Sequence, residues 1–96
     1  MMVLVSYDVS TTTAAGVRRL RKISEICLDY GIRVQDSVFE CNVDPAQWEQ
    51  LKDRLLSLFD AEKDSLRFYY LGSNWRRRVE HHGKTGLTDL EDPLIV

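Results

Sequence analysis

The stretch RVQDSVFECNV, residues 33–43, decides the fold, because it is rich in strand-forming residues and has a candidate turn in its middle. Asp36 and Ser37 are short polar residues that favour a tight turn, although the same pair could mark a bend within one longer strand. We interpret the stretch as two short strands that follow one another directly. A strand pair, rather than a single strand, then separates the segments on either side.

Both flanks of this strand pair have the periodicity of amphipathic helices. Upstream, STTT offers N-cap residues, and apolar side chains then recur on one face of a helix over about residues 14–30, which Gly31 ends. Downstream, Asp44 as N-cap, Pro45 as the first helical residue and Gln47 in a capping box predict a helix start. The second helix then has an apolar stripe over about a third of its circumference, made of Trp48, Leu51, Leu55, Leu58 and Phe59.

Two further strands complete the pattern. VLVSYDVS over residues 3–10 and SLRFYYLG over residues 65–72 have the alternation of apolar residues that strands show. The element order is β-α-β-β-α-β, the split pattern of the ferredoxin-like fold, and we predict an α+β sandwich. WRRRVEHH, residues 75–82, could add an extra C-terminal strand. We therefore expect one domain over residues 1–82 and an extended tail over residues 83–96.

Length and charge limit the classes of function. The 96 residues fit one domain, and at this size a dimer interface would add useful apolar burial. The net charge of −2 is not that of a protein that coats nucleic acid. Residues 85–96 carry −3, which leaves +1 for the rest, concentrated in RRLRK at 18–22 and RRR at 76–78. Binding to nucleic acid is therefore allowed locally.

Several other kinds of site are disfavoured. Cys27 and Cys41 form no CxxC motif, so packed free thiols in a reducing compartment are expected. The adjacent His81 and His82 would point to opposite faces of a strand, which disfavours a shared metal ion. We find no nucleophile elbow and no glycine-rich phosphate loop. With no leader-like segment and no apolar run near the ~18 residues of a membrane span, we predict a cytoplasmic protein without membrane contact.

Asp8 ends the first strand on its polar face and is the main candidate for a chemical role. It could simply begin the turn to the next element, since short acids at strand ends often bond nearby backbone amides. It could instead bind a metal ion. Magnesium binds through one or two carboxylates plus waters and phosphate oxygens, so Asp8 would need a second ligand from elsewhere.

The first predicted helix carries basic residues of two kinds. Arg18, Arg21 and Lys22 share a face with acidic residues, which favours a solvated face with ion pairs over a binding surface. Arg19 lies instead at the margin of the apolar face. Its guanidinium must reach across the strand ends, where a carboxylate or a phosphate near Asp8 would serve as its partner.

The C-terminal region combines a basic and an acidic segment. Arg76 and Arg78 would share one side of a strand and could follow a phosphate backbone, although a charged edge that resists aggregation explains them equally well. The closing DLEDPLIV ends in an apolar stub, and Pro93 keeps it out of the centre of a sheet. Such a strand commonly pairs with an exposed edge, which could belong to another chain.

Taken together, several motifs resemble the CRISPR-associated protein two family, the partner of the integrase in spacer acquisition. The motifs are YDVS, RRLRK, YGIRVQDSVFEC, DPAQWEQLKDRL and FYYLG, and the resemblance covers essentially the whole chain. VEHHG and the closing DLEDPLIV resemble the subtype I-C branch. The resemblance implies a ferredoxin-like homodimer, a fold that the toxin-type messenger-RNA interferases of the VapD kind share.

The resemblance also implies roles for individual residues. Asp8 becomes the catalytic and metal-binding residue, and Mg²⁺, or alternatively Mn²⁺, is shared by Asp8 of both subunits. Together with the basic segments, the resemblance predicts a nucleic-acid surface formed by Arg18, Arg19, Arg33, Ser37, Phe39, Arg76, Arg77 and Arg78. The apolar stub of Leu94, Ile95 and Val96 is predicted to bind the CRISPR-associated integrase.

Two functions from different classes follow from this resemblance. In the first, the homodimer is a magnesium-dependent endonuclease that hydrolyses phosphodiester bonds in DNA or RNA. In the second, it is a structural scaffold without nuclease activity, which bridges integrase dimers and binds the protospacer duplex. A messenger-RNA interferase of the VapD kind, acting on single-stranded RNA, is a further alternative.

Overall fold

The computed structural model describes residues 1–83. Their order of elements confirms the predicted β-α-β-β-α-β pattern, with a short 3-10 helix, η1, after it. The elements are β1 (Met2–Asp8), α1 (Ala14–Leu28), β2 (Ile32–Gln35), β3 (Val38–Asn42), α2 (Pro45–Leu58), β4 (Ser65–Gly72) and η1 (Trp75–Arg77). The predicted integrase contacts of Leu94, Ile95 and Val96 lie outside the described residues.

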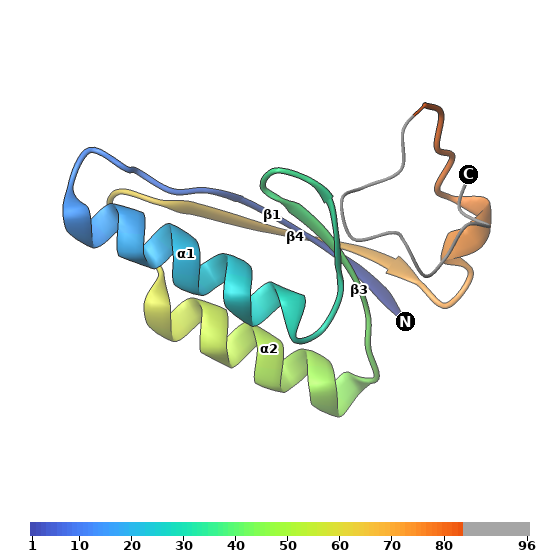
Figure 1. Cartoon of the computed structure of the whole chain (residues 1–96). Helices are drawn as coiled ribbons and strands as arrows, with labels where there is room; N and C mark the ends of the chain where they lie inside the picture. The colour runs from blue at the N-terminus through green and yellow to red at the C-terminus, as the bar shows by residue number, and fades with distance from the viewer. Residues whose placement is uncertain (84–96) are drawn as a thin grey trace.

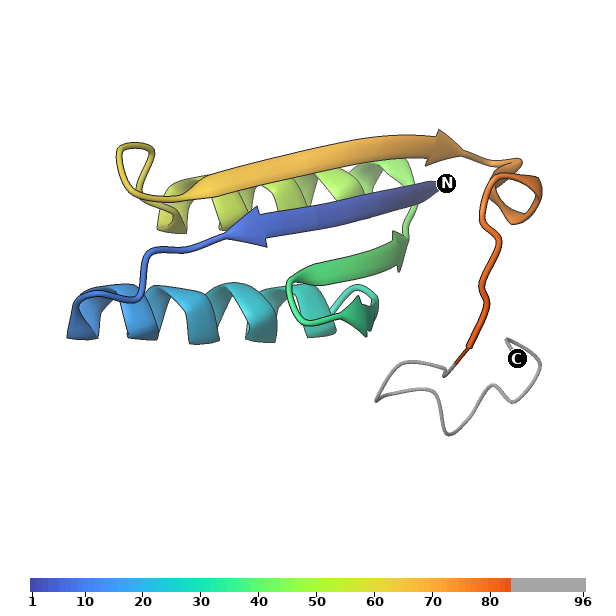
Figure 2. The ribbon, with the colours of Figure 1, turned by 90° about the horizontal axis from the view of Figure 1, so that it is seen from above.

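The four strands form one antiparallel sheet with the order β2-β3-β1-β4, and both helices cover the same face of it (Figure 1). This is the ferredoxin-like arrangement. Figure 2 shows β1 between β4 and β3. β1 is therefore central, β2 and β4 are the edge strands, and the face opposite the helices is called the open face below.

The stretch over residues 33–43 forms two strands, as predicted. Asp36 and Ser37 make the turn between β2 and β3, and Gln35 pairs with Val38 across it. A two-residue connection can only join antiparallel neighbours, so the hairpin leaves no room for a third helix between these strands. β1 can then pair with β3 and form the centre of the sheet.

The core lies between the sheet and the two helices. Alternate residues of β1 point into it, since successive side chains of a strand face opposite sides. From α2, the predicted stripe contributes Trp48, Leu51 and Leu55, which are all buried. The largest fully buried side chains are Phe39, Ile23, Leu51, Leu55, Val3, Val5, Cys27 and Cys41.

Local signals in the sequence fix the helix ends. The Thr13 hydroxyl accepts a hydrogen bond from the amide of Gly16 at the start of α1. At the start of α2, Asp44 and Gln47 form the reciprocal bonds of a capping box. After α1, Gly31 passes so close to β3 that a Cβ atom there would lie 2.3 Å from the carbonyl oxygen of Glu40. Only glycine fits this approach.

The extra strand predicted over residues 75–82 is wrong, because Trp75–Arg77 form η1 and residues 78–82 are not in a strand. Gly72 ends β4 with a φ of +77°, a conformation that glycine adopts without steric cost. The amide of Arg78 then donates to the carbonyl of Trp75 over 2.8 Å and closes a single helical turn. The arginines therefore do not alternate between two faces as on a strand.

Candidate metal and nucleic-acid site

The candidate site lies where β1 ends. Asp8 is the last residue of β1, it is exposed, and its position in the strand puts it on the open face. On one side it pairs with Ser65, the first residue of β4. On the other side, the amide of Tyr7 donates to the carbonyl of Ser37 over 3.1 Å. The structure thus brings Asp8 and Ser37, two predicted site residues, to the same end of the sheet.

The Asp8 carboxylate is the kind of ligand that a magnesium or manganese ion prefers, but it supplies too few ligand atoms by itself. Hard divalent cations prefer accessible carboxylate oxygens, which Asp8 supplies. Within residues 1–83, however, no group of three His, Cys, Asp or Glu side chains is placed to hold a metal ion. A metal bound at Asp8 would therefore need ligands from a second subunit, from a substrate phosphate or from water.

A buried carboxylate holds the loop that follows Asp8. The side chain of Asp64 has no exposed surface and accepts hydrogen bonds from four N–H donors. Arg19 donates from Nε (2.7 Å) and Nη2 (3.1 Å), and the amides of Ser10 (3.1 Å) and Asp60 (2.9 Å) supply the other two. The Arg19 hydrogen bond is the largest cause that lowers the pKa of Asp64 to about 2. Asp64 therefore stays charged at neutral and mildly acidic pH.

The partner of the Arg19 side chain is Asp64. This partner is a carboxylate near Asp8, as one of the two predicted alternatives had it, because Asp64 directly precedes the Ser65 that pairs with Asp8. Asp64 itself was missed by the sequence analysis. The one available signal was the position of Arg19 at the edge of an apolar helix face, where an arginine needs an acidic partner. Asp60, Glu62 and Asp64 all lie just before the next strand, so the sequence did not show which of them is that partner.

Phe39 is a core residue, so the prediction that it contacts nucleic acid is wrong. Its side chain has no exposed surface. It stacks on Tyr7 with a ring-centroid distance of 6.2 Å, and the guanidinium of Arg33 lies 5.1 Å from its ring centroid. Such a cation–π contact stabilises the packing of β2 on β3. Arg33 and Ser37 are half-buried around this core residue.

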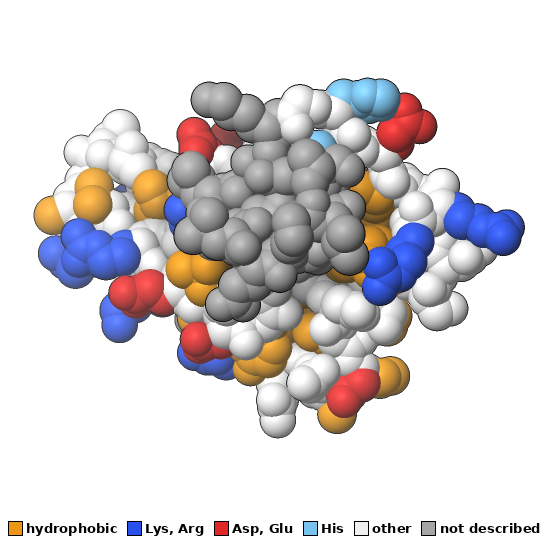
Figure 3. All heavy atoms as spheres, turned by 45° about the vertical axis from the view of Figure 1, so that its right-hand side comes forward, with side chains coloured by type: hydrophobic (Ala, Val, Ile, Leu, Met, Phe, Trp, Pro, Cys, Tyr) orange, Lys and Arg blue, Asp and Glu red, His pale blue; other side chains and the backbone are white. Residues whose placement is uncertain are grey.

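Four of the predicted basic residues are exposed, and they lie in two separate places. Arg18 lies on the outer surface of α1, and Arg76, Arg77 and Arg78 lie on η1 and directly after it. In Figure 3, Lys and Arg side chains gather near both lateral margins of the face shown. The Arg76 guanidinium stacks over the Trp75 ring, 4.6 Å from its centroid.

The arginines of η1 and Asp8 lie at opposite ends of the sheet. β4 runs antiparallel to β1, so Gly72 lies beside Met2 while Ser65 lies beside Asp8. At ~3.3 Å per residue, the length of β1 separates the two ends by roughly 20 Å. Within one chain, the structure therefore does not join η1 and Asp8 into a single site.

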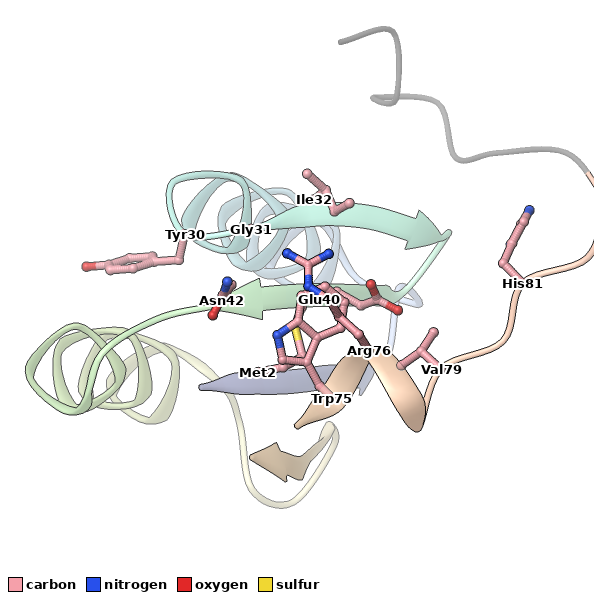
Figure 4. A pocket seen from close by; sticks show the side chains of 10 residues that line it. All are labelled: Met2, Tyr30, Gly31, Ile32, Glu40, Asn42, Trp75, Arg76, Val79 and His81. Atoms are coloured by element: carbon pink, nitrogen blue, oxygen red, sulfur yellow. The ribbon is translucent and has the colours of Figure 1, made fainter. Parts of the chain in front are cut away.

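A cavity of about 720 Å³ lies at the η1 end, on the open face. In Figure 4, Trp75 and Arg76 come over Met2 and Glu40. Burial raises the pKa of Glu40, and His81 opposes that shift. The complete lining is Met2, Tyr30, Gly31, Ile32, Glu40, Asn42, Trp75, Arg76, Val79 and His81. This cavity is thus separate from Asp8.

Comparisons with known proteins agree with this geometry. The family model described as CRISPR associated protein Cas2 matches residues 1–79. A Nitratidesulfovibrio vulgaris protein named CRISPR-associated endoribonuclease Cas2 is 64% identical over 96 residues, which is 100% of this chain and 94% of that one. A Halalkalibacterium halodurans protein named CRISPR-associated endonuclease Cas2 is 56% identical, covering 99% of both chains. The crystal structure of Streptococcus pyogenes Cas2 superposes with a TM-score of 0.75 at 58% identity and covers 86% of this chain and 100% of its own.

The fold and the site define the class as a ferredoxin-like α+β protein with an exposed acid at the end of its central strand. The chain belongs to the CRISPR associated protein Cas2 family. That confirms the resemblance found in the sequence at the level of the family. No helix within residues 1–83 is both long and apolar enough to cross a membrane.

Proposed function

We propose that this protein is a metal-dependent endonuclease of a CRISPR system, which hydrolyses phosphodiester bonds of RNA or DNA as a homodimer. The observation that carries the proposal is the exposed Asp8 carboxylate at the end of a rigid central strand. The relatives named endoribonuclease and endonuclease support the reaction class. A single carboxylate holds a divalent ion poorly, and a twofold axis that brings two copies of Asp8 together would supply a second ligand, which supports the homodimer.

Apolar side chains on the open face also support the homodimer. Ile32 and Tyr69 belong to the side of the sheet that the helices leave uncovered, and they are 36% and 43% exposed. Burial against a second copy would remove this exposed apolar surface from water.

The compartment that we propose is the reducing cytoplasm, which fits the free, buried thiols of Cys27 and Cys41.

In the proposed mechanism, the protein supplies a fixed negative charge and the metal supplies the chemistry. Mg²⁺, or Mn²⁺ in its place, would activate water and neutralise charge that develops on the phosphate. Asp8 and its copy in the second subunit would hold the ion. Because β1 is paired on both sides, the two carboxylates would be presented without reorganisation during the reaction.

The proposal is tested by cleavage assays with the purified protein, using 5′-labelled single-stranded RNA and duplex DNA. We expect cleavage of at least one substrate at an Mg²⁺ concentration on the order of 5 mM, which exceeds the dissociation constant of a weak oxygen-ligand site. Excess EDTA should abolish it, and added Mn²⁺ should restore it. Equal cleavage with and without EDTA would contradict the proposed metal dependence.

A scaffold role in spacer acquisition is the second candidate, and the exposed arginines favour it. Arg76, Arg77 and Arg78 form a compact basic group away from Asp8. Such a group can hold a phosphate backbone without cutting it. The proposal includes binding to duplex DNA and bridging of integrase dimers, with the stub Leu94, Ile95 and Val96 as the integrase contact.

Replacing Arg76, Arg77 and Arg78 together by alanine should weaken duplex DNA binding and flatten its dependence on salt. Each phosphate contact contributes about one unit to the slope of log affinity against log salt, so the slope should fall by up to about three units. Fluorescence anisotropy with a labelled duplex measures this slope. The salt concentration is varied between 50 and 300 mM, roughly the range over which such slopes are measured.

The matched control removes the same charge from α1 by replacing Arg18, Arg21 and Lys22 with alanine. All three are exposed. An unchanged slope in the η1 variant together with a smaller slope in the α1 variant would move the DNA surface to α1. Unchanged slopes in both would refute phosphate binding by either basic group.

A further inference from the structure

We propose that Asp64 and Arg19 are positioning residues for Asp8, and that Arg19 acts through Asp64 and does not contact the nucleic acid. The inference rests on the proposed function, because it takes Asp8 as the metal ligand. It assigns a role to Asp64 and replaces the predicted role of Arg19 as a nucleic-acid contact.

Asp64 lies where it can fix the position of Asp8. Asp64 directly precedes Ser65, the residue that pairs with Asp8 across the β1–β4 ladder. Its Oδ1 also accepts the amide of Ser10, two residues beyond Asp8. The carboxylate therefore ties the chain after Asp8 to the chain beside Asp8, and any shift of Asp64 displaces the end of β1.

The loop after Asp8 is held from a second side as well. Gly16 of α1 lies against Ser10, and a Cβ atom at position 16 would be 1.9 Å from the Ser10 carbonyl oxygen. Tyr7 and Val9, the neighbours of Asp8, are both buried in the core. Asp8 is thus an exposed residue between two anchored ones, so its backbone has little freedom and its side chain starts from a fixed point at the end of β1.

The Arg19 guanidinium is already engaged by Asp64. Its Nε and Nη2 donate to the two oxygens of Asp64, and its side chain is only 15% exposed. A phosphate contact would have to compete with a charged, fully buried acceptor. Removing Arg19 from Asp64 would leave a buried carboxylate without its counter-charge, which is strongly unfavourable.

The variant Asp64→Asn tests the hydrogen bonds of Asp64 without changing the size of its side chain. Each oxygen of Asp64 accepts two N–H groups, Oδ1 from Ser10 and Arg19 and Oδ2 from Asp60 and Arg19. In Asp64→Asn one oxygen becomes an NH₂ group, which faces two donors whichever way the amide turns. The variant keeps the shape of the side chain and breaks half of this network.

The experiment compares wild type, Asp64→Asn, Arg19→Lys and Arg19→Gln. Three quantities are measured: Mn²⁺ affinity by electron paramagnetic resonance, single-turnover cleavage at saturating metal, and nucleic-acid affinity in EDTA. For Asp64→Asn and Arg19→Gln we expect Mn²⁺ affinity or the cleavage rate to fall by about 10- to 100-fold, as for other residues that orient a metal ligand. Arg19→Lys should recover part of the loss. Nucleic-acid affinity in EDTA should stay within about twofold, since Arg19 holds no phosphate.

The matched control is Asp29→Asn, which breaks an ion pair of the same chemistry with Arg54 on the outer surface of the helices. It should leave all three quantities unchanged. Circular dichroism and size-exclusion chromatography report folding and oligomeric state. If Asp64→Asn does not fold, the two Arg19 variants decide: loss of metal affinity with normal binding in EDTA supports positioning.

Failure of this inference is distinguishable from failure of the proposed function. Folded Asp64→Asn and Arg19→Gln with wild-type Mn²⁺ affinity and cleavage would overturn the positioning role, even if Asp8→Asn is inactive. Weaker nucleic-acid binding of Arg19→Gln in EDTA would overturn it too, because it would show a phosphate contact. If wild type itself neither binds Mn²⁺ nor cleaves, the proposed function fails first and the inference fails with it.

Discussion

Replacing Asp8 by asparagine will reduce magnesium-dependent cleavage by more than about 100-fold. Mutation of a residue that only orients a metal ligand already lowers metal affinity or activity by about 10- to 100-fold, and Asp8 is proposed to bind the metal itself. The change removes one negative charge per subunit from the proposed metal site and keeps the shape of the side chain. Asp8 is exposed and lies outside the buried core. The fold and the oligomeric state should therefore be unchanged.

Rates with saturating Mg²⁺, circular dichroism and size-exclusion chromatography together test this expectation. The matched control is Asp53→Asn, which removes the same charge from an exposed position on α2 and should retain wild-type rates. Wild-type cleavage by Asp8→Asn would remove Asp8 from the metal site. An unfolded variant would show instead that Asp8 is a turn residue with a structural role.

Phe39→Ala will lower the free energy of unfolding by about 3–5 kcal/mol, the cost of truncating a fully buried aromatic side chain and leaving a cavity. Phe39 is central to the packing, because it contacts Tyr7 of β1 and lies under Arg33 of β2. Truncating a surface residue that contacts nucleic acid would lower the free energy of unfolding far less. The size of the loss therefore tests the assignment of Phe39 to the core.

Urea unfolding at one fixed protein concentration measures this loss, because the stability of a dimer depends on concentration. Val17→Ala is the control, since Val17 is 42% exposed on α1 and should change stability by less than about 0.5 kcal/mol. A loss below about 1 kcal/mol for Phe39→Ala would contradict the core assignment.

Local patterns in the sequence were sufficient to predict the four strands and two helices. Period-two alternation in residues 3–10 and 65–72 and the capping box at Asp44 each act within one element, so they can be recognised without knowing the fold. The same is true of the Asp36–Ser37 turn, whose two residues force an antiparallel hairpin. Together these elements leave the ferredoxin-like sheet as the arrangement that buries the apolar faces.

Only the tertiary structure decided which side chains meet. Phe39 and Asp8 were both predicted as site residues, yet their places in the strands put Phe39 in the core and Asp8 at the surface. Trp75–Arg77 were predicted as part of a strand, but after the turn at Gly72 they form a 3-10 helix at the far end of the sheet. Arg19 and Asp64 are 45 residues apart and form their ion pair only because α1 and the start of β4 pack together. Such long-range contacts depend on the whole packing arrangement, so the sequence could show that Arg19 needed a partner but not which acid it would be.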